Sequence, residues 1–350
     1  MSNSNRTPEK SKIKWLFLTA IICAMLLSAG CLTAKKEPVR CERTVIVLGT
    51  AARFSAEGNE AESAVTECIE RLENIAREID AENPESSIAR LNADAGTGDW
   101  IPLSPEAWHI LSVSQQYSAL TDGAWDATIG PLTSLWRKAL ATKTPPAAED
   151  VSTARAMVDW KKLELRESDK SARLSQKGMT LDLGGAFKGY ALDECRRIYA
   201  KRHVTGLIDL GTSSIAAVGG KTDSAPFRIA LRHPRKEKSA NLGIVNLKDA
   251  VLSTSGDYEH CFLADGVRYH HLINTHTGYP AQSGLSSVSI RIAATQEDAG
   301  LVSDMLSTAF FVMGAQKSHA LLPTLPVHIE AVFADEQGNI ADSFGNILEK

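Results

Sequence analysis

The feature that most constrains this chain is a short apolar run at its N-terminus. Residues 1–14 carry four basic side chains and one acidic side chain, and an uncharged apolar run follows from Trp15 to Leu27. A helix needs roughly 20 apolar residues to cross a bilayer, so this run is too short to span comfortably. A basic head followed by a short apolar run is typical of a secretory signal. We therefore expect residues 1–30 to be a signal peptide and the later residues to fold around a core of their own.

The residues that end the apolar run predict the kind of signal. Ser28, Ala29 and Gly30 are small, and Cys31 follows them. This pattern resembles a bacterial lipobox, in which the cysteine is lipidated and becomes the mature N-terminus, although Leu27 stands one position earlier than the usual leucine. We expect a lipoprotein signal over residues 1–30, a lipid on Cys31 and a charged, proline-containing tether over residues 31–43. An ordinary signal peptide or an uncleaved anchor, with Cys31 incidental, is the alternative.

Such an anchor places the protein on a bacterial membrane, at the extracytoplasmic (periplasmic) face, and we expect the inner membrane. Removing four basic residues and one acid from totals of 38 and 42 leaves 34 and 41, a formal charge of −7. This mildly acidic balance, without a basic patch, argues against nucleic acid as a partner.

The cysteines do not form a recognisable framework. Beyond the signal and Cys31, four remain, with no CxxC pair and no metal-ligand spacing. An oxidising compartment permits a bridge between Cys41 and Cys68, and buried free thiols are the alternative.

The pattern of apolar residues predicts a mixed fold. Ala61–Ile79 carries a helical apolar stripe, and Ser104 followed by Pro105 indicates the start of a second helix. Strands and helices neither alternate strictly nor segregate, so we expect the α+β class. The remaining expectations are a strand over 44–48, a loop over 141–150, a helix from about 188 to 202, a strand over 267–272, a helix over 297–313 and a closing strand over 327–334.

The segment Thr180–Tyr190 has the properties of an anion-binding turn. Two glycines follow an apolar strand end, and the expected helix begins near Lys188. Glycine lets the backbone approach a ligand, and a helix N-terminus presents free N–H groups to an anion. A tight strand-to-helix turn with a solvated Lys188 explains the same residues without a ligand.

Two histidines end the expected strand over 267–272. Successive strand residues face opposite sides, so only one of His270 and His271 can address a given site. Farther along, Asp304 and Thr308 lie four residues apart on one face of the expected last helix. A carboxylate and a hydroxyl suit a hard ion such as Mg²⁺. An interior aspartate bonded to a nearby threonine is the alternative.

Together these segments resemble the ApbE family of FAD:protein FMN transferases. The resemblance covers most of residues 44–334, and its motifs occur in the family's order. It implies a domain over residues 44–340 with mixed sheets, packed helices and two interlocked lobes that hold FAD in a cleft. The segments that carry it are Thr121–Trp136, Asp182–Tyr190 with Asp193, Ser253–Tyr258, Tyr269–Leu272 with Thr277-Gly278, and Asp304–Thr308.

The resemblance also implies roles for individual residues. His271 matches the histidine beside the pyrophosphate that the family needs for activity. Gly185, through its carbonyl, with Asp304 and Thr308, matches the Mg²⁺ ligands. Leu48 stands where the family usually has the methionine of a Met-Gly-Thr sequence near the flavin. The other positions that match FAD contacts are Ala124, Trp125, Asp126, Asp182 and Lys188.

The activity that the resemblance implies is Mg²⁺-dependent transfer of FMN from FAD to a threonine hydroxyl of an acceptor protein, such as a membrane redox-complex subunit. The product is a phosphoester-linked flavin, and AMP is released. Two alternatives remain open at this point. One is an FAD pyrophosphatase, in which water replaces the threonine, and the other is a non-catalytic flavin-binding lipoprotein.

Overall fold

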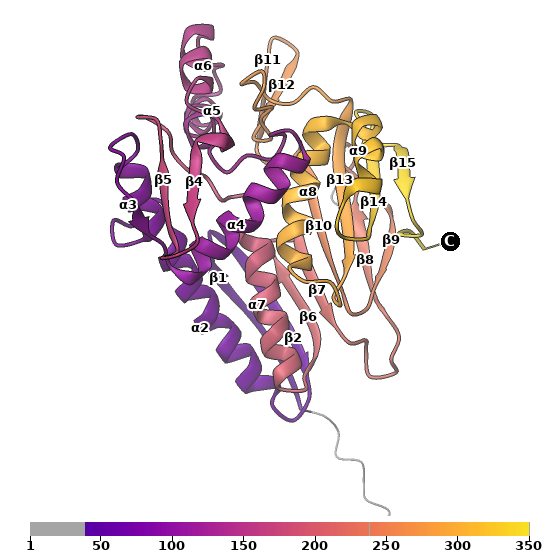
Figure 1. Cartoon of the computed structure of the whole chain (residues 1–350). Helices are drawn as coiled ribbons and strands as arrows, with labels where there is room; N and C mark the ends of the chain where they lie inside the picture. Colours follow the sequence, from indigo (N-terminus) through magenta and orange to yellow (C-terminus); the bar gives the residue numbers. More distant parts are fainter. Residues whose placement is uncertain (1–38, 238, 350) are drawn as a thin grey trace, which may run out of the picture. The chain divides into compact units, whose positions relative to one another are not determined.

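The computed structural model describes residues 39–349 except residue 238 (Figure 1). The predicted signal peptide, the lipidation site Cys31 and most of the predicted tether lie outside the described residues. No helix in the described part of the chain is both long and apolar enough to cross a bilayer. The residues from Val39 onward form one compact unit.

A sheet of eight strands organises this unit, and every neighbouring pair in it is antiparallel. The strands follow one another across the sheet in chain order, although other elements separate some neighbours in the sequence, so the first and last strands lie at opposite edges. Its order is β1 (Arg40–Val47), β2 (Thr50–Glu57), β6 (Thr205–Leu210), β7 (Ser214–Val218), β10 (Ala250–Gly256), β13 (Leu285–Ala293), β14 (Ile329–Asp335) and β15 (Ile340–Phe344).

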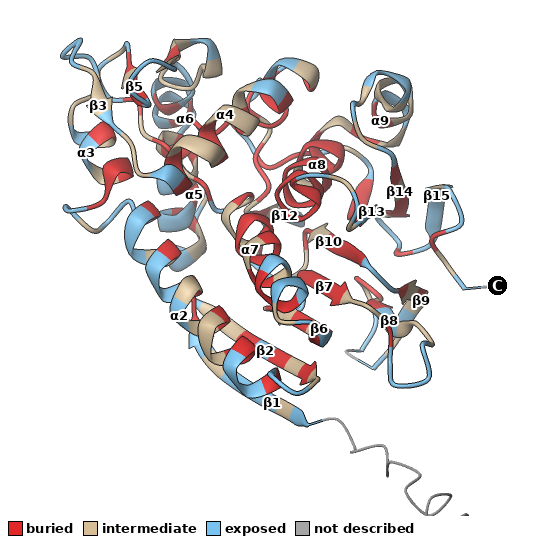
Figure 2. Cartoon of the chain, turned by 60° about the horizontal axis from the view of Figure 1, so that its bottom comes forward, coloured by how far each residue is buried: buried red, intermediate tan, exposed pale blue. Residues whose placement is uncertain are grey.

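Three helices cover one face of this sheet: α2 (Ala61–Ile79), α7 (Phe187–Lys201) and α8 (Ala299–Met313) (Figure 2). Alternate strand residues point to opposite faces. Ala216 and Val251 therefore join the core under the helices, whereas Ile215 and Leu252 pack on the other side beside β8 (Phe227–Arg232) and β9 (Asn241–Leu247). Helix α8 is buried nearly all round, as is typical of a central helix.

Smaller elements complete the unit around this sheet and its three helices. They include a sheet of three short strands and a separate two-stranded hairpin. The helices among them are α3 (Ser87–Ala93), α4 (Pro105–Leu120), α5 (Gly130–Thr142), α6 (Ala148–Arg155) and α9 (Ala315–Leu321), with short 3₁₀ turns η1 (Trp160–Lys162) and η2 (Leu322–Thr324); the strands are β3 (Ile101–Pro102), β4 (Leu163–Arg166), β5 (Ser171–Leu174), β11 (Cys261–Ala264) and β12 (Val267–His270).

The mixed α and β class predicted from the sequence is confirmed, as is the helix Ala61–Ile79. The Ser104 cap is also confirmed, because its hydroxyl accepts the N–H of Ala107 at 3.2 Å before α4 begins at Pro105. The described residues behave as one unit, so the division into two interlocked lobes stays a prediction.

Several predicted boundaries are wrong. Strand β1 begins at Arg40, because residues 40–43 of the predicted tether pair with β2. The predicted loop over 141–150 contains the end of α5 and the start of α6. The predicted strand over 267–272 ends at His270, and the last long helix begins at Ala299 because Asp298 adopts a left-handed φ of 52°.

The cysteine alternatives are resolved for the described residues. Cys41 and Cys68 are both free thiols, so the permitted bridge between them does not form. The Cys68 thiol is buried and lies 3.7 Å from the backbone carbonyl of Cys195.

Candidate functional site at helices α7 and α8

The glycine turn before α7 is held by the side chain of Asp182. One carboxylate oxygen accepts the N–H of Gly184 at 2.8 Å, and the other accepts the hydroxyl of Thr133 at 2.6 Å. The backbone N–H of Asp182 donates to Ala127 at 2.9 Å, which ties the turn to the segment after Trp125. The hydrogen bonds of Asp182 therefore fix the conformation of the turn. The helix that follows, α7, begins at Phe187.

Gly185 lies between two of the predicted site residues. A Cβ placed on Gly185 would lie 2.9 Å from the ring of Trp125 and 3.2 Å from the hydroxyl of Thr308. A larger residue would crowd both groups, so a glycine is needed here. The structure thus brings together Gly185 and Thr308, which the sequence analysis assigned to one metal site.

Asp304 is the buried charge of this site. Its carboxylate accepts the N–H of Gly189 at 3.0 Å and the hydroxyl of Ser214 at 3.2 Å. Burial raises the pKa of Asp304, while the nearby Lys188 acts in the opposite direction. An ionised carboxylate in an apolar helix is costly unless a cation compensates it. A bound cation would supply that compensation.

These donors fit Mg²⁺ better than they fit a softer metal. Within residues 39–349 as described, no group of three or more His, Cys, Asp and Glu side chains could hold a metal. The predicted set instead combines the Asp304 carboxylate, the Thr308 hydroxyl and the Gly185 carbonyl. All are oxygen donors, which Mg²⁺ prefers, and water and phosphate oxygens commonly complete its shell.

Lys188 lies in the first turn of α7. Its ammonium group donates to the hydroxyl of Ser213 at 2.7 Å, in the turn between β6 and β7. That turn meets the tip of the β1–β2 hairpin, since a Cβ on Gly211 would lie 2.2 Å from the Thr50 hydroxyl. Leu48, with a φ of 54°, forms this hairpin tip and is partly buried. The turn that holds Lys188 therefore also contacts the hairpin that carries Leu48.

His271 follows directly after β12. Its backbone N–H donates to the carbonyl of His260 at 3.1 Å, and the two imidazole rings meet edge to face with centroids 5.3 Å apart. Burial, followed by the neighbouring His260, His270 and Lys188, lowers the pKa of His271 to about 3. Among the described residues its Nδ1 atom is buried without a hydrogen-bond partner. His271 is thus a neutral imidazole with an unsatisfied nitrogen.

His270 has a different environment. Its Nε2 atom lies 3.1 Å from the carbonyl of Ala281, and its ring meets Phe311 of α8 edge to face at 5.4 Å. The backbone N–H of Leu272 donates to its Nδ1 atom. Both ring nitrogens are therefore engaged, and His270 serves the packing of the β12 end on α8. The two rings have different neighbours, but His271 lies beyond the end of β12, so the strand alternation on which the prediction rested does not apply to it.

The three residues of the segment Ala124–Asp126 are all buried. The Trp125 indole donates to Ser114 at 2.7 Å. Asp126 accepts two bonds from Thr128 at 2.7 Å and one from the N–H of Trp160 at 2.9 Å. Burial raises the pKa of Asp126 to about 6. The Asp126 carboxylate thus holds the conformation of the loop. Asp126 is also one of the residues that line a cavity of about 310 Å³.

Two further contacts were not predicted from the sequence. Ser214 donates to Asp304, and Asp193 accepts the N–H groups of Gly300 and Leu301. Asp193 belongs to the sequence segments described above, but no local signal indicates its partner, because that partner lies more than 100 positions along the chain.

The whole backbone can be compared with solved structures. It is similar to the crystal structure of the ApbE protein of Thermotoga maritima, with a TM-score of 0.74 and 28% identity over 86% of this chain and 96% of that chain. It is also similar to the apo form of the Pseudomonas stutzeri flavinyl transferase ApbE, with a TM-score of 0.74 and 27% identity over 89% and 96%. The fold is therefore that of the flavin transferase class.

Sequence comparison identifies the family to which the chain belongs. Residues 46–333 match the model of the ApbE family. The FAD:protein FMN transferase of Treponema pallidum is 28% identical over 96% of this chain and 95% of its own length, and one from Klebsiella pneumoniae is 30% identical over 79% and 83%. The chain belongs to the ApbE family.

Proposed function

We propose that the protein transfers the FMN half of FAD to a threonine hydroxyl of an acceptor protein, in a Mg²⁺-dependent reaction that releases AMP. The observation that carries this proposal is the meeting of Asp304, Thr308 and the glycine turn at the start of α7, close to Lys188. The names of the relatives, FAD:protein FMN transferase, support it.

The cation and the pyrophosphate would share this site. Mg²⁺, held by Asp304, Thr308 and the Gly185 carbonyl, would neutralise pyrophosphate oxygens and charge on the departing AMP. Lys188 and the N–H groups at the start of α7 attract the same anion. Ser213 holds the Lys188 ammonium group at 2.7 Å, which limits its movement and directs its charge into the site.

His271 suits the proton transfer. In the proposed reaction the threonine oxygen bonds to the FMN phosphorus, the bond between that phosphorus and the AMP oxygen breaks, and the hydroxyl proton must leave. A neutral imidazole has one unprotonated nitrogen that can accept this proton. The pKa of about 3 keeps His271 neutral at physiological pH in the free enzyme, and the negative charge of a bound pyrophosphate would raise that pKa towards the range that a general base needs.

The lipid anchor belongs to the same proposal. A lipid on Cys31 would hold the enzyme at the extracytoplasmic face of the inner membrane, where a membrane-bound acceptor such as a redox-complex subunit is within reach. The lipobox-like sequence before Cys31 supports this placement.

The proposal is tested by incubating the purified protein with FAD and Mg²⁺, with and without a candidate acceptor. We expect covalent flavin on a threonine of the acceptor and AMP in solution. Free FMN and AMP, formed at the same rate without any acceptor, would instead identify a pyrophosphatase. FAD that stays intact through long incubation with Mg²⁺ and acceptor would indicate a flavin-binding protein.

A further inference from the structure

Helices α7 and α8 cross at two glycines that leave no room for side chains. A Cβ on Gly189 would lie 2.2 Å from the carbonyl oxygen of Gly300. A Cβ on Gly300 would lie 2.3 Å from the carbonyl oxygen of Gly189. The two backbones are therefore in direct contact at the first turn of each helix.

Each helix also carries an aspartate that accepts backbone N–H groups of the other helix. Four residues after Gly189, the carboxylate of Asp193 accepts the N–H of Gly300 and the N–H of Leu301, both at 2.9 Å. Four residues after Gly300, the carboxylate of Asp304 accepts the N–H of Gly189 at 3.0 Å. We call these five residues, Gly189, Asp193, Gly300, Leu301 and Asp304, the α7–α8 clasp.

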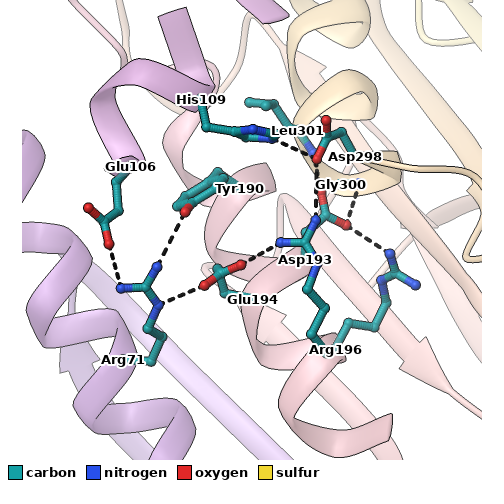
Figure 3. A network of polar contacts seen from close by, with 11 residues as sticks. Arg71, Glu106, His109, Tyr190, Asp193, Glu194, Arg196, Asp298, Gly300 and Leu301 are labelled. Carbon is teal, nitrogen blue, oxygen red and sulfur yellow. Dashed lines mark hydrogen bonds and ion pairs between the residues drawn. The ribbon is translucent and has the colours of Figure 1, made fainter. Parts of the chain in front are cut away.

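The clasp replaces the ordinary N-cap of α8. Asp298 stands at the cap position but makes no side-chain cap bond. Its carboxylate instead contacts His109 of α4 at 2.8 Å (Figure 3). It also contacts Arg197 of α7 at 3.3 Å. The first turn of a helix has free N–H groups that need acceptors. In α8, Asp193 provides acceptors for two of them from the neighbouring helix.

Asp193 is enclosed by groups that fix its orientation. Its side chain is fully buried and accepts a bond from Arg196 at 3.1 Å (Figure 3). Arg196 in turn donates to the carbonyl of Ala294 at 2.8 Å, in the segment that leads to α8. Asp193 therefore has little freedom to rotate. Its two carboxylate oxygens fix the position of the first turn of α8 relative to α7.

We propose that Asp193 is a positioning residue for the cation that Asp304 binds, a role that rests on the proposed function. Asp193 does not reach the cation. It holds the first turn of α8, and Asp304 lies one turn farther along the same helix. Because Asp304 is also bonded to Gly189 of α7, any shift at the clasp moves the carboxylate relative to Gly185 and Lys188.

The first experiment uses the wild-type protein. Coupling between two sites is reciprocal, so a cation that needs a closed clasp must also stabilise the clasp. We expect Mg²⁺ alone to slow hydrogen exchange at the backbone amides of Gly189, Gly300 and Leu301, as measured by NMR. Unchanged exchange at these amides, in protein shown by calorimetry to be saturated with Mg²⁺, would overturn the inference.

The second experiment compares the variants Asp193→Asn and Glu106→Gln. Asparagine keeps the shape of Asp193 but provides a single acceptor oxygen for the two N–H groups. Glu106→Gln weakens one contact of Arg71, which joins α4 to α2 and also bonds Glu194 of α7 at 2.7 Å, but it leaves every bond of Asp193 in place (Figure 3). Changes to the partners that orient a metal ligand typically cost about 10–100-fold in metal affinity. We expect that loss in Asp193→Asn, measured as the Mg²⁺ dissociation constant by calorimetry, and no change in Glu106→Gln.

Thermal melts of both variants separate positioning from general stability. A lower melting temperature in both, with weaker Mg²⁺ binding only in Asp193→Asn, supports the inference. Equal Mg²⁺ affinity in Asp193→Asn and wild type, or an equal loss in Glu106→Gln, would contradict it. If Asp193→Asn does not fold, the wild-type exchange experiment decides. Wild-type protein that binds no Mg²⁺ would overturn the proposed function itself, and the inference with it.

Discussion

At the scale of single residues, burial and neighbouring charges shift the pKa values of two predicted site residues, Asp304 and His271. Asp304 is fully enclosed and has its pKa raised by burial, whereas His271 has its pKa lowered to about 3, first by burial. In the proposed reaction, the Asp304 carboxylate would be stabilised by a bound cation, and His271 would act as the neutral base. The charge of Lys188 affects both groups, and a cluster of titratable groups with perturbed pKa values is typical of an active site.

The metal assignment predicts different effects for the two side-chain ligands. Asp304 supplies charge, whereas Thr308 supplies a neutral oxygen. Asp304→Ala should therefore abolish FMN transfer, and Thr308→Ala should retain transfer with a higher Mg²⁺ requirement. The measurement is the transfer rate as a function of Mg²⁺ concentration. Full activity in Asp304→Ala at low Mg²⁺ would show that the cation site lies elsewhere.

The two neighbouring histidines should separate chemistry from stability. Losing a group that assists proton transfer typically costs about 10²–10⁴-fold in rate, and we expect that loss in His271→Ala while FAD still binds. His270→Ala removes the buried contact with Ala281 and should lower the melting temperature with little effect on turnover. Transfer rates at saturating FAD and Mg²⁺, with thermal melts, test both. Lost turnover in His270→Ala alone would reverse the assignment.

At the scale of elements, local signals predicted individual helices but not how they meet. The apolar stripe over α2, and Ser104 with Pro105 before α4, depend on neighbouring residues and are visible in the sequence. The bond between Gly189 and Asp304 joins positions 115 residues apart. No periodicity encodes such a contact, because it arises only when α7 and α8 pack on the same sheet.

The site residues also divide into those that local sequence signals predict and those that depend on contacts between distant segments. Asp304 and Thr308 could be paired from their helical spacing, and Gly185 could be added through the family resemblance. The roles of Ser214 and Asp193 could not, since each depends on a strand or helix brought in from elsewhere in the chain. The end of β12 was also mispredicted: its apolar and aromatic pattern continues to Leu272, but pairing with β11 stops at His270.

The contact between α4 and the start of α8 predicts a pH dependence. The hydrogen bond to Asp298, the largest cause, raises the pKa of His109 above 6.5. A raised histidine pKa stabilises the folded protein fully below the unfolded value of about 6.5. That stabilisation is lost as pH rises through the folded value. The difference in melting temperature between wild type and His109→Gln should therefore shrink from pH 6 to about pH 8.5. A difference that stays constant or grows would contradict this assignment.

At the scale of the whole molecule, the described domain is a folded unit from Val39 onward, preceded by the predicted signal and lipid attachment site. The large sheet and its three covering helices are internal to that unit. Anchoring and catalysis should therefore be separable properties of the chain.

The anchor is tested by Cys31→Ser. We expect this variant to keep a folded, active domain but to be released from membranes or to remain unprocessed. The measurements are membrane fractionation and the intact mass of the N-terminal peptide. Wild-type protein that carries no lipid on Cys31 would refute the anchor, whatever activity the domain has.

The most direct test of the central claim is the appearance of covalent flavin on an acceptor. Purified wild-type protein and Asp304→Ala are each incubated with FAD, Mg²⁺ and acceptor-containing membranes from cells that lack this enzyme. Protein-bound flavin is detected by fluorescence in denaturing gels, and the modified residue is identified by mass spectrometry. The account predicts FMN in phosphoester linkage to a threonine, formed by wild type only and abolished by a chelator. Flavin that stays entirely unbound while wild type converts FAD to FMN and AMP would contradict it.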